Sequence, residues 1–407
     1  MPSSYSGKFQ YLDAAGAVLQ QGACQFGFDA ESAILTPQNA SPIVFDLGDI
    51  DRITARDWDL EIALYTGRKL QLRQFGAAFG NLSPALAAAW RDRTVQCLLL
   101  EDLQQIERFS GAASWNGAAA EPAEIRLYRS NLAVLTASSK PFQWRLAEVD
   151  SAVFDNSSYS VVLQSLGERL EISRLAKRTD EFAGRLQGAL DVLHSQAASA
   201  LRQAFPFLDP DALQQLASTL REGRSIALPT LAAIDRKLPD AFVARAVGDR
   251  LRPYFDVLKS RATGPLMAGF KFIWEGDVAE SDAAEPAGDA EEAAPDEDKM
   301  PLFFWFFFPL GNGIVAWEAS TGSGHATYFF RVEGPVEEAV AHLTRGLALV
   351  NFRREPVYLP DESLEQQAKF HRYAIACRKL PDLRALRAAY MKRALHTSVE
   401  AWQPQLP

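Results

Sequence analysis

Residues 69–73 alternate between polar and apolar side chains. Leu70 and Leu72 are flanked on both sides by charged or amide residues. A period of two is typical of a strand with one buried and one exposed face. Gly67 separates this run from the apolar run 60–64. Because tight hairpins favour a residue with positive φ, the two runs are predicted to form a hairpin.

The same pattern recurs about 100 residues further along the chain. The apolar positions, the hairpin glycine and the acidic residues before the strands occupy matching places in both copies. The matching segments are 33–37 with 133–137, 45–51 with 144–150, and 60–72 with 160–172. Recurrence at a fixed offset indicates two copies of one structural unit.

A long amphipathic helix is expected at the end of each copy. The first is predicted over about 84–109 and the second over about 179–205, because apolar residues recur there at helical spacing. Each copy is therefore predicted to contain about six or seven short strands followed by one helix. Such a helix can bury the open corner that a strongly bent small sheet leaves.

This order of elements, present over residues 5–110 and again over 123–205, resembles the pleckstrin-homology-like (PH-like) superfold. The resemblance implies an antiparallel β-sandwich or barrel with one end closed by a C-terminal helix. It covers about half of the chain and rests on the pattern of elements. The same pattern also allows two generic antiparallel α+β domains.

Members of the PH-like family often bind phosphoinositides through basic residues in the first hairpin. We assign residues 24–37 to this hairpin in the first copy, where Asp29 and Glu31 are present and Lys and Arg are absent. The equivalent segment of the second copy has three separated basic residues, Arg126, Arg129 and Lys140. The resemblance therefore favours family members that bind proteins or peptides.

Residues 206–262 are predicted to form a connector of short helices. Asp209 precedes a proline and then an apolar helical repeat, a typical helix start. Further helices are expected over about 228–236 and 239–260, and Pro253 should kink or divide the last one. We expect this connector to pack on its neighbours.

A second β-rich region follows the connector. The predicted strands are 266–274, 302–310, 313–320 and 325–332. Residues 276–299, between the first two strands, contain ten Asp or Glu and one Lys. Because this composition cannot bury a core, we expect a disordered acidic loop inserted between two paired strands.

Residues 303–308 are five phenylalanines and one tryptophan. This strand does not alternate, so both of its faces should be covered. A helix predicted over about 336–350 can cover one face, and the C-terminal helices or a partner can cover the other. The alternative is a surface that binds a partner or dips into a membrane.

The C-terminal helices are predicted over about 364–377 and 381–402. Eight basic residues and one acidic residue, Asp382, lie between positions 369 and 393. The basic residues, our candidates for partner binding, are Lys369, Arg372, Arg378, Lys379, Arg384, Arg387, Lys392 and Arg393. They form either a solvated face or a surface that meets the acidic loop or an anionic partner.

The formal net charge is −9, and the acidic segment accounts for all of it. The rest of the chain is balanced, which argues against nucleic-acid binding. The three cysteines lie far apart without a CxxC pair or a histidine cluster. We therefore expect buried free thiols, no metal and no cofactor. The N-terminus has no signal-peptide pattern, and the apolar runs are too short to span a membrane, which favours a cytoplasmic protein.

The residue types of catalysis are present without a matching constellation. His325 follows Ser323, but a GxSxG elbow and an orienting acid are missing from the sequence. His194, His342 and His396 are placed on predicted helices as ordinary surface or packed residues. The acidic residues that recur before the strands, Asp49, Asp51, Glu148 and Asp150, indicate a shared turn. We therefore expect no catalytic residues.

The sequence thus predicts an α+β chain. Its expected parts are two PH-like domains (1–112 and 113–205), a helical connector (206–262) and a C-terminal domain of antiparallel sheet and helices (263–407). We expect a non-enzymatic interaction or scaffold protein with an unknown protein partner. The alternatives are binding of an anionic membrane surface through the basic C-terminal helices, and an enzyme with a pocket in the C-terminal domain.

Overall fold

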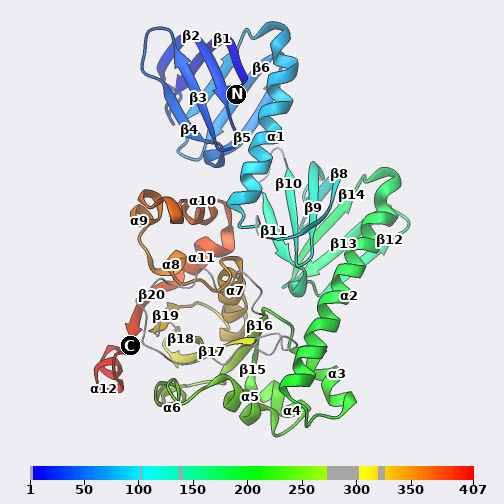
Figure 1. Ribbon diagram of the computed structural model, residues 1–407, viewed down its shortest axis with the longest axis vertical. Helices are drawn as coiled ribbons and strands as arrows, with labels where there is room; N and C mark the ends of the chain where they lie inside the picture. The colour runs from blue at the N-terminus through cyan, green and yellow to red at the C-terminus, as the bar shows by residue number, and fades with distance from the viewer. Residues whose placement is uncertain (1–2, 101–102, 137–140, 273–301, 320–325) are drawn as a thin grey trace, which may run out of the picture. The chain divides into compact units, whose positions relative to one another are not determined.

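The computed structural model describes residues 3–100, 103–136, 141–272, 302–319 and 326–407. The chain is α+β and forms two compact units (Figure 1). The N-terminal unit comprises residues 1–187 and 361–380, and the C-terminal unit comprises residues 188–360 and 381–407. Residues 361–380 thus belong to the N-terminal unit, although their neighbours in sequence belong to the C-terminal unit.

The first repeat of the N-terminal unit is a seven-stranded antiparallel sheet in the order β4-β3-β2-β1-β7-β6-β5. Its strands are β1 (Ser3–Leu12), β2 (Val18–Phe28), β3 (Ser32–Pro37), β4 (Ile43–Asp46), β5 (Ile50–Arg56), β6 (Asp59–Leu64) and β7 (Lys69–Arg73). Helix α1 (Phe79–Cys97) follows, and Leu86 and Trp90 of α1 are buried in the core of this sheet.

The second repeat has the corresponding strand order, β11-β10-β9-β8-β14-β13-β12. Its strands are β8 (Gln105–Trp115), β9 (Glu121–Tyr128), β10 (Asn131–Thr136), β11 (Phe142–Arg145), β12 (Ser151–Asp155), β13 (Ser160–Ser165) and β14 (Glu168–Ser173). Helix α2 (Thr179–Ala204) follows. Equal strand number, strand order and closing helix confirm the internal repeat.

The alternation that predicted strand β7 is present in the structure. Leu70 and Leu72 are fully buried, while the neighbouring polar side chains reach the other face. Gly67 and Gly167 have φ values of +81° and +80° at the hairpin turns. A side chain would strain this backbone, which explains a glycine in both copies.

The helix predicted at the end of the first repeat is longer than the observed helix α1. The prediction extends this helix to about residue 109, but α1 ends at Cys97 and Gln105–Trp115 forms strand β8. The left-handed backbone of Leu99, with φ of +61°, stops the helix. Ile106 and Phe109 also match helical spacing, so the apolar pattern favoured the wrong element there.

The hairpin predicted as the first of each repeat is the second hairpin in the structure. Residues 24–37 form the β2–β3 hairpin, whereas β1 and β2 are joined by residues 13–17. In the second repeat, the corresponding β8–β9 connection is 116–120. Neither connection contains Lys or Arg. The first hairpin connections of both repeats, like the hairpin 24–37, therefore lack the basic residues that phosphoinositide-binding members of the PH-like family use.

The C-terminal unit is built on a six-stranded antiparallel sheet in the order β15-β16-β17-β18-β19-β20. The strands are β15 (Ser225–Ala227), β16 (Met267–Phe272), β17 (Leu302–Gly311), β18 (Ile314–Ala319), β19 (Ala326–Arg331) and β20 (Tyr390–Leu395). Strands β16 and β17 pair directly, so the acidic segment 276–299 does connect paired strands. The segment itself lies outside the described residues.

The aromatic strand β17 belongs to the core, as predicted for a strand covered on both faces. Phe304 packs on Phe242 of α5 (Leu238–Ala246) with ring centroids 5.0 Å apart. On the opposite face, Trp305 packs on Phe352 with ring centroids 4.2 Å apart. Helices α5 and α6 (Arg252–Arg261) of the connector therefore cover the Phe304 face of β17, and the expectation that the C-terminal helices or a partner cover it is wrong.

The connector contains the predicted helices and one strand, β15, that was not predicted. Helix α3 (Pro210–Thr219) begins with Asp209 as its N-cap, and α4 (Leu228–Ile234) follows. The last predicted helix is divided before Pro253 into α5 and α6. The three residues of β15 were missed because so short a run carries no readable period.

The C-terminal helices differ from the prediction. Their elements are α7 (Val336–Leu349), α8 (Glu355–Tyr358), α9 (Asp361–Gln366), α10 (His371–Lys379), α11 (Pro381–Ala389) and α12 (Val399–Trp402). The predicted helix 381–402 is interrupted by strand β20, which pairs with β19 at the edge of the sheet. Pairing with a distant strand overrode the local helical pattern. No described helix is long and apolar enough to cross a membrane.

Candidate functional site

The eight basic candidates do not lie together on one helical face. Lys369, Arg372, Arg378 and Lys379 belong to the N-terminal unit, on the 3₁₀ turn Ala368–Phe370 and helix α10. The other four belong to the C-terminal unit, on α11 and β20. Lys392 and Arg393 are thus strand residues, and the predicted helical position of both is wrong.

In the N-terminal unit, Arg378 and Lys379 attach helix α10 to the first repeat. Arg378 donates to Asp49 at 2.7 Å and to Glu365 at 2.9 Å, and its guanidinium lies 3.9 Å from the ring centroid of Tyr65. The Lys379 ammonium is buried and donates to the carbonyl oxygen of Ile50 at 2.9 Å. Both cations therefore have partners within the chain.

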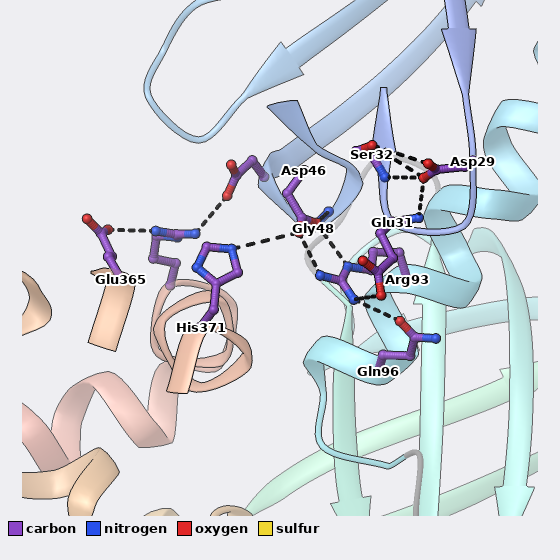
Figure 2. A network of polar contacts seen from close by, with 11 residues as sticks. Asp29, Glu31, Ser32, Asp46, Gly48, Arg93, Gln96, Glu365 and His371 are labelled. Atoms are coloured by element: carbon purple, nitrogen blue, oxygen red, sulfur yellow. Dashed lines mark hydrogen bonds and ion pairs between the residues drawn. The ribbon is translucent and has the colours of Figure 1, made fainter. Parts of the chain in front are cut away.

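Asp46 extends these contacts into the network shown in Figure 2. Its carboxylate accepts hydrogen bonds from Arg93 at 3.0 and 2.6 Å and from the Gly48 amide at 2.6 Å. The imidazole of His371, on α10, lies 3.7 Å from the same carboxylate. We call Asp46, Asp49, Arg93, Arg378 and Lys379, with His371, the junction cluster.

The junction cluster is suited to holding helix α10 in place. Burial raises the pKa of Asp49 and lowers that of Lys379, so each charge depends on a nearby opposite charge or carbonyl. The hollow beside Arg378 and Lys379 has a volume of about 20 Å³, room for about one water molecule. Such a network fixes the position of α10 on the first repeat.

The C-terminal unit uses most of its four basic candidates internally. Arg387 donates to the carbonyl oxygens of Pro356 and Leu359, the latter at 2.9 Å. Lys392 donates to the Gln405 carbonyl at 2.6 Å, and the Arg393 guanidinium lies 3.7 Å from the Tyr358 ring centroid. Arg384 is exposed on α11 and also has an interaction within the chain.

A carboxylate, a hydroxyl and an imidazole meet inside the C-terminal unit. The Thr327 hydroxyl lies 2.7 Å from Glu318 and 2.9 Å from His396. The Trp402 indole N–H donates to the same hydroxyl at 3.0 Å. Since a hydroxyl has one donor and two acceptor sites, Thr327 donates to Glu318 and accepts from His396 and Trp402.

Glu318, Thr327 and His396 are residue types found in active sites, but their arrangement is not that of a catalytic nucleophile and its base. Thr327 is fully buried and Glu318 is 1% exposed. The Thr327 proton points to the carboxylate, whereas a nucleophile would give it to the imidazole. His396 follows strand β20, so its predicted position on a helix is wrong. The enclosure indicates a structural role.

The remaining chemical candidates lie outside the described residues, in recurring turns or in ion pairs. Ser323 and His325 lie outside the described residues. Asp49 and Glu148 both end a 3₁₀ turn before a strand, at Leu47–Asp49 and Leu146–Glu148. The shared turn inferred from their recurrence is thus present. Arg126 of the second repeat is buried and bonded to Asp92 and Glu124 at 2.6 and 2.5 Å.

An open polar hollow of about 330 Å³ lies on strands β5, β6 and β7 of the first repeat. We call it the arginine hollow. It is lined by Arg52, Thr54, Arg56, Asp59, Leu60, Glu61, Gln71 and Arg73. Arg52 and Arg56 are exposed, and across the part of the chain that the structure describes neither forms an ion pair or side-chain hydrogen bond.

Sequence reasoning missed the arginine hollow. The signal was present, because Arg52, Thr54 and Arg56 alternate with Ile53 and Ala55. A period of two places the polar residues on one face of a strand. Basic residues are denser in the C-terminal region, with eight between positions 369 and 393, so charge density alone points away from this strand.

Comparisons with known proteins give partial likenesses only. No protein-family model and no curated protein matches the chain. The C-terminal domain of an unknown protein from Leishmania infantum is 12% identical, with a TM-score of 0.22, over 24% of this chain and 93% of that chain. The Spt16D Pob3N heterodimer is 12% identical, with a TM-score of 0.17, over 40% of this chain and 83% of that chain.

Proposed function

We propose that this protein is a non-enzymatic, cytoplasmic interaction protein whose two sheet-and-helix repeats are PH-like domains. The seven-stranded order and closing helix of each repeat support the PH-like assignment. The three cysteines are free and buried, which suits a reducing compartment. The arginine hollow carries the proposal, because it is an exposed site with two uncompensated arginines.

A protein partner fits these features better than a membrane does. The β1–β2 and β8–β9 connections have no basic residue, and Arg378, Lys379 and Arg387 are engaged within the chain. Anionic membranes attract clusters of accessible Lys and Arg. Trp58 is 64% exposed and precedes Asp59, which lines the hollow. Tryptophan is a residue type that dominates protein interfaces.

Affinity capture from a native lysate with the full chain tests this function. We expect a saturable protein partner on the wild-type chain and on the control Arg129→Glu/Arg202→Glu, which changes two exposed arginines elsewhere. Arg52→Glu/Arg56→Glu should lose this partner. The proposal would be contradicted if Arg52→Glu/Arg56→Glu captured the partner as well as the control variant does. It would also be contradicted if the chain bound vesicles in a flotation assay and captured no protein.

A further inference from the structure

We infer that the arginine hollow binds an extended acidic peptide segment of a partner protein. This inference rests on the proposed function and specifies the chemistry of the partner. The peptide carboxylates would pair with Arg52 and Arg56, the two lining arginines that have no anionic partner within the described chain. Arginine binds carboxylates through two parallel hydrogen bonds, which gives direction as well as affinity.

The strand register places these donors on one face. Thr54 pairs with Glu61, and Arg56 pairs with Asp59, across β5 and β6. Arg52 lies two residues from Thr54 and projects to the same face. The two arginines are therefore about 13 Å apart along the strand, a distance that an extended peptide covers with every second side chain facing the protein.

The acidic residues of the hollow already have cationic or amide partners. Arg73 pairs with Asp59 at 3.0 Å, and Gln71 donates to Glu61 at 3.1 Å. Lys69 approaches Glu61 at 3.8 Å. The positive charge left over belongs to Arg52 and Arg56, so the complementary ligand is an anion. The nearby carboxylates favour spaced single charges over a dense phosphate cluster.

Trp58 is an exposed aromatic residue in the hairpin that joins Arg56 to Asp59, two residues that line the hollow. It is 64% exposed at the tip of the β5–β6 hairpin, and its ring lies 5.7 Å from that of Phe79. Asp57 and Trp58 both have positive φ, +48° and +68°. Two-residue hairpins usually place Asn and Gly at such positions. A large aromatic residue there is costly for the turn and is consistent with selection for binding.

The second repeat shows that the fold itself does not require this hollow. The registers of β12 with β13 and of β13 with β14 place Ser151, Val153 and Asp155 where the first repeat has Arg52, Thr54 and Arg56. The Asp155 carboxylate is occupied by Ser157 and Ser158 at 2.6 and 2.8 Å. The basic surface is therefore specific to the first repeat.

The position of β5 also suits a peptide. It is the terminal strand of its sheet, and an extended peptide can add its main chain to such an edge. Main-chain pairing would fix the peptide in register, and the two arginines would select acidic side chains. This combination predicts modest affinity that decreases with salt.

The test uses the full chain and a fluorescent decapeptide of alternating glutamate and threonine, with a glutamine–threonine decapeptide as neutral control. We expect the acidic peptide alone to bind, with at least about tenfold weaker binding to Arg52→Glu/Arg56→Glu. Arg129→Glu/Arg202→Glu, with the same change in charge, should stay within about twofold. Thermal melting monitors folding of each variant.

Three outcomes would overturn the inference: equal binding to both variants, equal binding of the neutral peptide, or Arg52- and Arg56-dependent binding of inorganic phosphate or phosphatidylserine vesicles in place of the peptide. Partner capture from lysate separates this inference from the proposed function. If capture requires Arg52 and Arg56 but the acidic peptide does not bind, the protein-binding function stands and the acidic-peptide chemistry is wrong.

Discussion

The Thr327 hydroxyl takes part in three hydrogen bonds that join two strands to the C-terminal end of the chain. Thr327→Val would leave a carboxylate and two N–H donors buried without this partner. Glu318 and His396 still lie 3.5 Å from each other. At about 1–3 kcal/mol for a buried group that loses its partner, we expect a loss of about 2–3 kcal/mol in unfolding free energy. Chemical denaturation measures this loss.

Thr327→Ser is the control, because it keeps the hydroxyl and should lose only about 1 kcal/mol in unfolding free energy. Equal losses in Thr327→Val and Thr327→Ser would contradict this account.

The buried cysteines make a separate prediction. Burial raises the pKa of Cys24 to about 11 and that of Cys97 to about 12, from 9.0. The folded chain therefore keeps protons that the unfolded chain releases above about pH 9. This contribution to stability is complete below about pH 9 and is lost as the pH rises through the folded values.

Thiol alkylation at pH 8 measures the consequence directly. We expect both thiols to react slowly in the folded chain, because the thiolate is the reactive form. They should react rapidly after denaturation in guanidinium, which serves as the control. Rapid labelling of Cys97 in the native chain would show that its environment is not as buried as described.

At the scale of elements, Gly48 determines how closely α10 approaches the first repeat. A methyl group on Gly48 would lie 2.9 Å from Asp46 Oδ1, from Cys97 Sγ and from Ile375 Cδ1 of α10. We expect Gly48→Ala to lower the unfolding free energy by about 1–3 kcal/mol through overpacking. Gly80→Ala, where nothing lies within 4 Å, is the matched control and should be neutral or stabilising.

Protease sensitivity of segment 361–380 distinguishes loosening of α10 from general unfolding. Gly48→Ala should expose this segment to cleavage before the sheets of the N-terminal unit unfold. Unchanged cleavage together with unchanged stability would indicate that α10 can shift without cost, and the junction cluster would then not be what holds it.

Elements were predictable where a local pattern determined them. The hairpin glycines, the alternation around Leu70 and the helix start at Asp209 are local features, and the structure contains the predicted turn, strand and helix. Strand β20 was missed because its pairing partner, β19, is far away in sequence. Strand β8 was missed because its apolar spacing fits a helix equally well.

At the scale of the whole molecule, the repeat could be predicted from the sequence, and the site that we propose lies where the two copies differ. Fold duplication preserves strand order and closing helices, whereas Arg52 and Arg56 occur in one copy only. The candidate site could not be predicted from charge density, since it depends on which residues the register brings together. The basic C-terminal residues, prominent in sequence, are divided between two units and mostly engaged.

Hydrogen–deuterium exchange on the full chain, with and without the saturating acidic decapeptide, tests the central claim most directly. We predict slower amide exchange in β5 and the β5–β6 hairpin, residues 50–60, and unchanged exchange in the equivalent residues 149–161 of the second repeat. The protection should vanish in Arg52→Glu/Arg56→Glu. Protection confined to residues 13–17 or to the basic C-terminal residues, with β5 unaffected, would contradict the account.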